Sequence, residues 1–124
     1  MNLSIDKQEK YVLVQIKEAK LTSNVAPELK AEVVVLHHEN FKNMIFDMSE
    51  VQYCDSSGLS AILVGYRMCR DNNGMFVLTG VQEHVKKLIS ISQLDTMLIQ
   101  LPTNNEAIDL IFMEEVEKHI HKEK

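Results

Sequence analysis

The chain has 124 residues, of which 45% are hydrophobic and 25% charged, and its formal net charge at pH 7 is −5. This length suits one domain with a core, and the composition lacks the low hydrophobicity and high charge of disordered chains. The acidic balance argues against a nucleic-acid partner, since binding a phosphate backbone requires a basic patch. No apolar run approaches the roughly 18 residues of a membrane span, and the N-terminus lacks a signal-peptide layout, so we expect a cytoplasmic protein.

The first forty residues predict two strands and a helix. Residues 4–7 and 11–16 should pair as an antiparallel ribbon, the second strand being rich in β-branched residues. After a polar connector, the first helix should begin near Asn24 and end over residues 37–40, which places Pro27 in its first turn. Apolar spacing predicts an inward face formed by Leu29, Val33, Val34, Val35 and Leu36.

The middle of the chain predicts a buried strand and a second helix. Residues 44–48 are too apolar for a strand with one solvated face, which suits a parallel strand covered on both sides. From residue 59 onward, apolar residues at i, i+3 and i+4 spacing predict a helix, namely Leu59, Ile62, Leu63, Tyr66 and Cys69. The polar turn at residues 55–58 should therefore join this strand to this helix.

The last third alternates strands and helices in the same way. We expect strands at residues 75–79 and 97–101, and between them a helix over residues 81–91 with an inward face of Val81, Val85, Leu88 and Ile89. Thr103 and Glu106 match a capping box that opens a final helix, whose predicted inward residues are Ala107, Leu110, Ile111 and Met113. From about residue 114 the sequence predicts a charged and frayed C-terminal end.

The predicted order of elements is ββαβαβαβα. Alternating strands and helices indicate an α/β fold, with a small mixed, mainly parallel sheet flanked by four helices and joined by right-handed crossovers. The sequence has no internal repeat, low-complexity stretch or linker, so one domain should span residues 1–124.

Cysteine and histidine spacing argues against a metal or redox site. Cys54 and Cys69 form no CxxC pair, so we expect buried free thiols. None of the five histidines is spaced with carboxylates or cysteines as a zinc site requires. His119 and His121 lie in the charged tail, where adventitious metal binding is the alternative to simple solvation. We expect no metal and no cofactor.

The polar turn at residues 55–58 is the candidate functional site. Asp and Ser side chains cap helices by accepting hydrogen bonds from the first N–H groups, so Asp55, Ser56 and Ser57 have a purely structural interpretation. The functional alternative is a hydroxyl held at a helix N-terminus for a phosphate. The turn does not fit the GxSxG pattern of a nucleophile elbow, and GxGxxG and GxxxxGKS/T nucleotide motifs are missing, so an enzyme is not expected.

Residues 46–59, with the sequence FDMSEVQYCDSSGL, resemble the signature of STAS domains, in particular that of the bacterial anti-sigma factor antagonists. The resemblance covers nearly the whole chain, and it implies a small sheet flanked by helices and a partner-switching function. The unphosphorylated protein would bind an anti-sigma factor that is also a serine kinase, and so release a sigma factor. The kinase would phosphorylate Ser56, and a serine phosphatase would reset the switch.

The resemblance also implies which residues meet the partner. The motif residues Asp55, Ser57, Gly58 and Leu59 adjoin Ser56, and in the family the loop after the second strand lies close to the phosphorylation site. We therefore expect partner binding at the motif and at the loop residues Lys20, Leu21, Thr22, Ser23 and Asn24.

This loop departs from the family pattern. The family usually has Gly, Glu, Leu or Ile, and Asp here, whereas this chain has Ala19, Lys20, Leu21 and Thr22. Because these residues change the charge of the loop, two alternatives to a phosphorylation switch stay open. A STAS domain can serve as a non-phosphorylated interaction scaffold in a signalling or transport complex. A small-ligand sensor is a further alternative, although no phosphate-cradling glycines support it.

Overall fold

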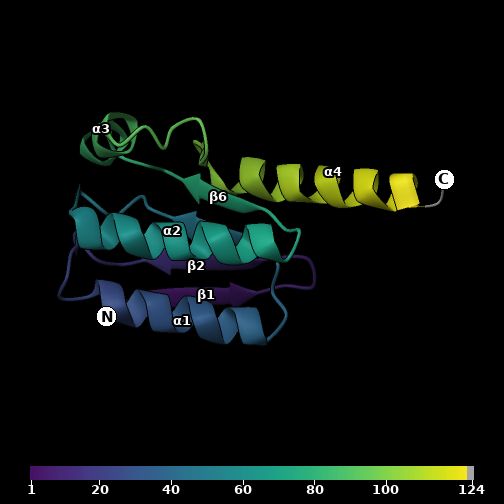
Figure 1. Cartoon of the computed structure of the whole chain (residues 1–124), viewed down its shortest axis with the longest axis horizontal. Helices are drawn as coiled ribbons and strands as arrows, with labels where there is room; N and C mark the ends of the chain where they lie inside the picture. Colours follow the sequence, from purple (N-terminus) through teal and green to yellow (C-terminus); the bar gives the residue numbers. More distant parts are fainter. Residues whose placement is uncertain (123–124) are drawn as a thin grey trace.

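A mixed five-stranded sheet runs through the centre of the molecule (Figure 1). In the computed structural model, which describes residues 1–122, its strands are β1 (Leu3–Lys7), β2 (Val12–Ile16), β4 (Met44–Asp47), β6 (Phe76–Thr79) and β7 (Ile99–Leu101). They lie side by side in this order. β1 and β2 form the predicted antiparallel ribbon, and the other neighbouring strands are parallel.

Helices cover both faces of this sheet. One face carries α1 (Ala26–His38), α2 (Ser56–Asp71) and α3 (Glu83–Ile91), and α4 (Asn104–Lys122) covers the other (Figure 1). Successive strand residues point to opposite faces, so each central strand contributes to both layers. Phe46 packs in the core on the side of α1 and α2, whereas Ile45 and Val77 pack against Ala107 and Ile111 of α4. Over the described residues, the predicted α/β fold with a mainly parallel sheet and four helices is confirmed.

A second, two-stranded sheet lies where the sequence predicted only a connector and a turn. β3 (Lys20–Leu21) pairs in parallel with β5 (Tyr53–Cys54). Strands of two residues are too short to show an alternating pattern, which explains why neither was predicted. Accordingly, β4 does not lead directly into α2, and this helix begins at Ser56 rather than at residue 59.

Most predicted inward residues of the helices face the core, and two do not. Val35 in α1 is 48% exposed and Met113 in α4 is 68% exposed, so both predictions were wrong. Met113 follows the buried Ile111 by two positions, which places it on the opposite side of the helix. The residues that are buried or half-buried as predicted are Leu29, Val33, Val34, Leu36, Leu59, Ile62, Leu63, Tyr66, Cys69, Val81, Val85, Leu88, Ile89, Ala107, Leu110 and Ile111.

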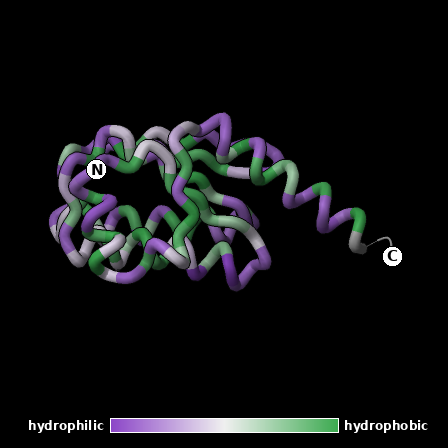
Figure 2. The backbone as a smooth tube through the Cα atoms, turned by 90° about the horizontal axis from the view of Figure 1, so that it is seen from above, coloured by the Kyte–Doolittle hydropathy of each residue, from purple (hydrophilic) through white to green (hydrophobic). Residues whose placement is uncertain are grey.

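The end of the chain, which the sequence predicts to be charged and frayed from about residue 114, begins as part of a helix. α4 continues to Lys122 and extends past the sheet, with polar and apolar residues alternating along its last turns (Figure 2). The predicted capping box opens this helix, since Thr103 N–H donates to Glu106 Oε2 over 3.2 Å and Glu106 N–H donates to Thr103 Oγ1 over 3.3 Å. The part of the predicted end at positions 123 and 124 lies outside the described residues.

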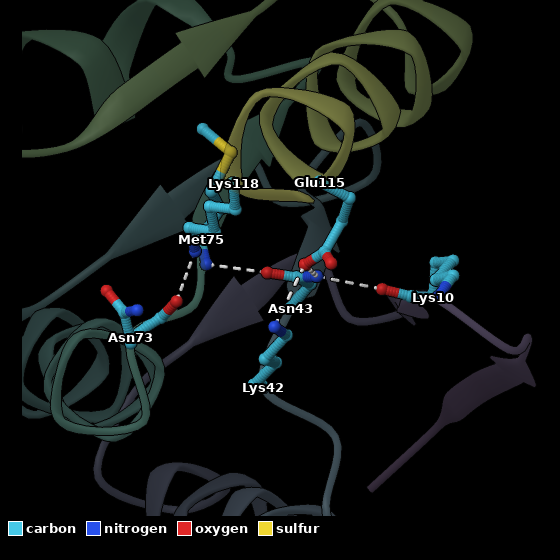
Figure 3. Close-up of polar contacts among 7 residues, drawn as sticks. All are labelled: Lys10, Lys42, Asn43, Asn73, Met75, Glu115 and Lys118. Carbon is cyan, nitrogen blue, oxygen red and sulfur yellow. Dashed lines mark hydrogen bonds and ion pairs between the residues drawn. The ribbon is translucent and has the colours of Figure 1, made fainter. Parts of the chain in front are cut away.

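Buried Asn43 connects α4 to the sheet (Figure 3). Its Nδ2 donates to the Lys10 carbonyl over 2.9 Å and to Glu115 Oε1 over 3.0 Å, while its Oδ1 accepts from Met75 N–H over 2.8 Å. The hydrogen bond from Asn43 and the nearby ammonium of Lys42, 3.2 Å away, lower the pKa of Glu115 against the opposing effect of partial burial. Part of the segment expected to fray is therefore held by buried polar contacts.

Candidate functional site

Asp55 caps the helix that carries the predicted serine. Its backbone is extended, and its Oδ1 accepts from Gly58 N–H over 2.9 Å. Its Oδ2 accepts a second hydrogen bond, from Ser23 N–H over 3.3 Å. Of the three candidate caps, Asp55 fills this role, and Ser56 becomes the first residue of α2 with an exposed side chain. The cap therefore leaves the Ser56 hydroxyl at the surface.

Gly58 allows the start of α2 to lie directly on β3. A Cβ atom at this position would lie 2.2 Å from the Leu21 carbonyl oxygen and 2.7 Å from Cys54 Sγ. Real Cβ atoms do not approach other heavy atoms so closely, so a side chain here would displace the backbone of β3. The glycine of the motif is thus explained by packing within the chain.

The small sheet brings the predicted loop beside the predicted serine. Its register places Lys20 next to Tyr53 and Leu21 next to Cys54, immediately before Asp55. The hydrogen bond between Ser23 and Asp55 ties the loop to the cap. The candidate partner-binding residues are exposed at Lys20, Ser23, Asn24 and Ser56, half-buried at Thr22, Asp55 and Ser57, and buried at Leu21, Gly58 and Leu59.

On the other side of Ser56 the surface is hollowed. A hollow of about 530 Å³ lies between β5 and α3, lined by Tyr53, Cys54, Asp55, Ser56, His84, Lys87, Leu88 and Ile91. The Tyr53 and His84 rings stack at 5.3 Å between centroids and 25° between planes. Ile91 is 80% exposed and Tyr53 44% exposed, so the hollow offers apolar as well as polar surface.

The α3 side of this hollow was missed in the sequence. His84, Lys87 and Ile91 are separated from Ser56 by more than 25 positions, and only the fold brings them to it. One signal was present, because Ile91 is an apolar residue that does not belong to the predicted inward face of its helix.

The thiol beside Ser56 is not activated as a nucleophile. Burial, and to a lesser degree the charge of Asp55, raises the pKa of the Cys54 thiol to about 12. Cys54 and Cys69 are free and buried, as predicted.

Within residues 1–122 no group of three or more His, Cys, Asp or Glu side chains could hold a metal ion, and the side chain of His121 is not among those described.

A buried polar cluster holds the first acid of the motif. Asp47, 8% exposed at the end of β4, accepts from Asn104 Nδ2 over 2.9 Å and from Ser49 N–H over 3.0 Å. Thr79 Oγ1 donates to Asn104 Oδ1 over 2.5 Å. Burial alone would raise the pKa of Asp47, but the hydrogen bonds from Asn104 and Ser49 outweigh it and lower the pKa. Asp47 therefore joins β4 to the start of α4 and lies apart from the hollow.

Comparisons with known proteins agree with this architecture. The family model of the STAS domain matches residues 2–108. Over 92 residues, 74% of this chain and 78% of its relative, the chain is 26% identical to BtrV of Bordetella bronchiseptica, which is named as an anti-sigma factor antagonist. No helix among the described residues has the length and apolar character needed to cross a membrane.

Solved structures show the same fold. An anti-sigma factor antagonist from Thermotoga maritima superposes with a TM-score of 0.79 and 21% identity, covering 88% of this chain and 93% of that one. The phosphorylated form of Bacillus SpoIIAA gives a TM-score of 0.71 and 18% identity, covering 89% of this chain and 99% of that one.

Proposed function

The chain belongs to the STAS domain family, and we propose that it is an anti-sigma factor antagonist switched off by phosphorylation of Ser56. In its unphosphorylated form it binds an anti-sigma factor with serine kinase activity in the cytoplasm, and a sigma factor is released. A serine phosphatase reverses the modification. The observation that carries the proposal is the position of Ser56, exposed at the first residue of α2 between the loop of residues 20–24 and the hollow.

The chemistry of the switch is supplied by the partner. Ser56 Oγ attacks the γ-phosphorus of ATP bound to the kinase, the bond from this phosphorus to the ADP oxygen breaks, and the hydroxyl proton passes to a base of the kinase. The product carries about −1.5 to −2 additional charges at pH 7. Near a helix N-terminus these charges meet the positive end of the dipole, which offsets repulsion from Asp55. The fold should therefore tolerate the phosphate.

A complex with the partner should not tolerate the phosphate on Ser56. A surface that is complementary to a hydroxyl must desolvate a bulky dianion, and a buried unpaired charge is strongly unfavourable. Shifting a complex from about 99% bound to about 1% bound requires roughly 5.5 kcal/mol. One phosphate at the centre of the interface can supply most of this energy.

Three substitutions test the proposal. Ser56→Ala should bind the anti-sigma kinase constitutively and resist labelling, whereas Ser56→Asp should bind weakly and melt near the wild-type temperature. Ser57→Ala is the matched control, since its half-buried hydroxyl does not cap α2, and it should still be phosphorylated. The measurements are mass spectrometry after incubation with the kinase and ATP, binding titration and thermal unfolding. Labelling of Ser57 with Ser56 unmodified, or unfolding of Ser56→Asp, would contradict the proposal.

The loop at residues 20–24 supplies a second part of the proposed partner surface. Lys20 is exposed beside Tyr53, and charges at the rim of an interface act mainly on association rate. Lys20→Glu should change the association rate of the partner and its salt dependence. An unchanged rate at low salt would remove this loop from the interface.

A non-phosphorylated scaffold is the second candidate. It is favoured by the loss of the usual acids in this loop, where Lys20 and Thr22 stand instead. A scaffold would bind its partner equally well with and without ATP, and the labelling experiment on Ser56 separates the two functions.

A further inference from the structure

We propose that the hollow between β5 and α3 receives the phosphoryl group of phosphorylated Ser56, and that Lys87 and His84 bind it there. This inference rests on the proposed function and deepens it, because it names what the chain itself does with the phosphate. The ligand is a phosphoserine dianion of the same chain.

Ser56, His84 and Lys87 line the same hollow, Ser56 from the start of α2 and the other two from α3. His84 and Lys87 are three positions apart on this helix, so their side chains emerge on the same face. Both are exposed, and the volume of about 530 Å³ leaves room for a phosphate between them and Ser56.

The charges facing the hollow favour an anion. Among its lining residues Asp55 carries the one carboxylate, and both of its oxygens already accept backbone hydrogen bonds, from Gly58 and from Ser23. Lys87 carries a positive charge, and His84 offers a ring N–H. The remaining polar group is the Tyr53 hydroxyl, since the raised pKa of Cys54 keeps its thiol neutral. A phosphate on Ser56 would therefore share this hollow with the positive charge of Lys87.

The geometry of His84 supports a receiving role. Its ring is stacked on Tyr53, which lines the same hollow. A phosphate held by Lys87 and His84 would occupy the space beside the exposed side chain of Ile91. Phosphorylation would thus also close a hollow that is open to a partner in the unmodified protein.

The test uses the full chain with phosphoserine incorporated at position 56 during translation, so that no kinase is required. Phosphorus NMR follows the titration of the phosphate. Its second pKa should lie below the value of about 6 for an unconstrained phosphoserine. Lys87→Gln should raise this pKa by about half a unit or more, because it removes a positive charge, and His84→Ala should raise it as well, because it removes a hydrogen-bond donor to the dianion.

Lys86→Gln is the matched control. Lys86 is the neighbouring residue on α3 and is also exposed, but it lines a different hollow together with Gly80 and Gln100. This substitution should leave the phosphate pKa unchanged. Equal shifts for Lys86→Gln and Lys87→Gln, or a phosphate pKa in the folded chain equal to that in urea, would overturn the inference. Thermal melts confirm that each variant is folded.

The two proposals can fail separately. Absence of kinase labelling at Ser56 refutes the switch, whereas an unperturbed phosphate in the translated phosphoprotein refutes the receiving hollow.

Discussion

Replacement of Asp55 separates its structural role from a role in recognition. The carboxylate accepts from Gly58 N–H over 2.9 Å at the start of α2 and from Ser23 N–H over 3.3 Å in the loop. Asp55→Ala removes both hydrogen bonds. Asp55→Asn keeps one side-chain oxygen that can cap the helix, since Asn and Asp are similarly good caps, and it removes the charge.

The expected loss of stability follows from these two contacts. Removal of a helix N-cap costs about 0.5–2 kcal/mol. A typical hydrogen bond contributes about 1 kcal/mol net to stability. The bond from Ser23 N–H should contribute somewhat less, because the Asp55 side chain is half-buried and the distance from nitrogen to oxygen is long. We expect Asp55→Ala to lose about 2 kcal/mol, which corresponds to a decrease in melting temperature of about 8 °C in a domain of this size. Asp55→Asn should lose about 1 kcal/mol or less.

Urea denaturation at pH 7 measures both free energies of unfolding, and titration with the anti-sigma kinase measures binding. Asp55→Asn should be folded, so a loss of partner binding in this variant would reflect the missing charge and not a disordered helix. A loss below about 0.5 kcal/mol for Asp55→Ala, or equal losses for Ala and Asn, would refute the capping role derived from the geometry.

Three further predictions concern the surroundings of the site. Gly58→Ala should lose at least about 2 kcal/mol in urea denaturation, because its Cβ would lie 2.2 Å from the Leu21 carbonyl oxygen, and a near-neutral result would contradict this packing. The lowered pKa of Asp47 contributes stability that is present above its unfolded pKa of about 3.9 and is lost as the pH falls through the folded value. Asp47→Asn should therefore abolish part of the difference in stability between pH 7 and pH 3. Cys54 and Cys69, with pKa values raised to about 12 by burial, should not react with a thiol reagent at pH 8 in the native protein, whereas both should react in urea.

The main strands and helices could be predicted because each is marked by a sequence pattern that lies within one segment and extends over several residues. β4 and β6 are buried at every position and apolar except at their last residues, Asp47 and Thr79, and the helices bury residues at regular spacing. The sheet β3–β5 could not be predicted, because each strand has two residues and is defined by a partner more than thirty positions away. The exposed Met113 was misassigned because an apolar residue type was taken as evidence of burial.

Part of the candidate site could also be predicted from the sequence, and part of it could not. The polar turn at residues 55–58 could be identified from the order of residues before a predicted helix, whereas the choice of Ser56 within it and the nearness of the Lys20 loop followed from the family resemblance. The wall formed by α3 could not be derived, since spacing within a helix indicates a shared face but not which distant segment that face meets. Only the folded structure shows that His84 and Lys87 lie at the same hollow as Ser56.

The start of α2 is stabilised by neighbours of Ser56 and hardly by Ser56 itself. Asp55 caps the helix, Gly58 packs against the backbone of β3, and Leu59 is buried in the core. The Ser56 side chain is exposed between these three anchors. A group attached to its hydroxyl can therefore change the charge of the surface while every contact that fixes the helix is kept. For this reason we expect the modification to act on partner affinity, and the folded state to be nearly indifferent to it.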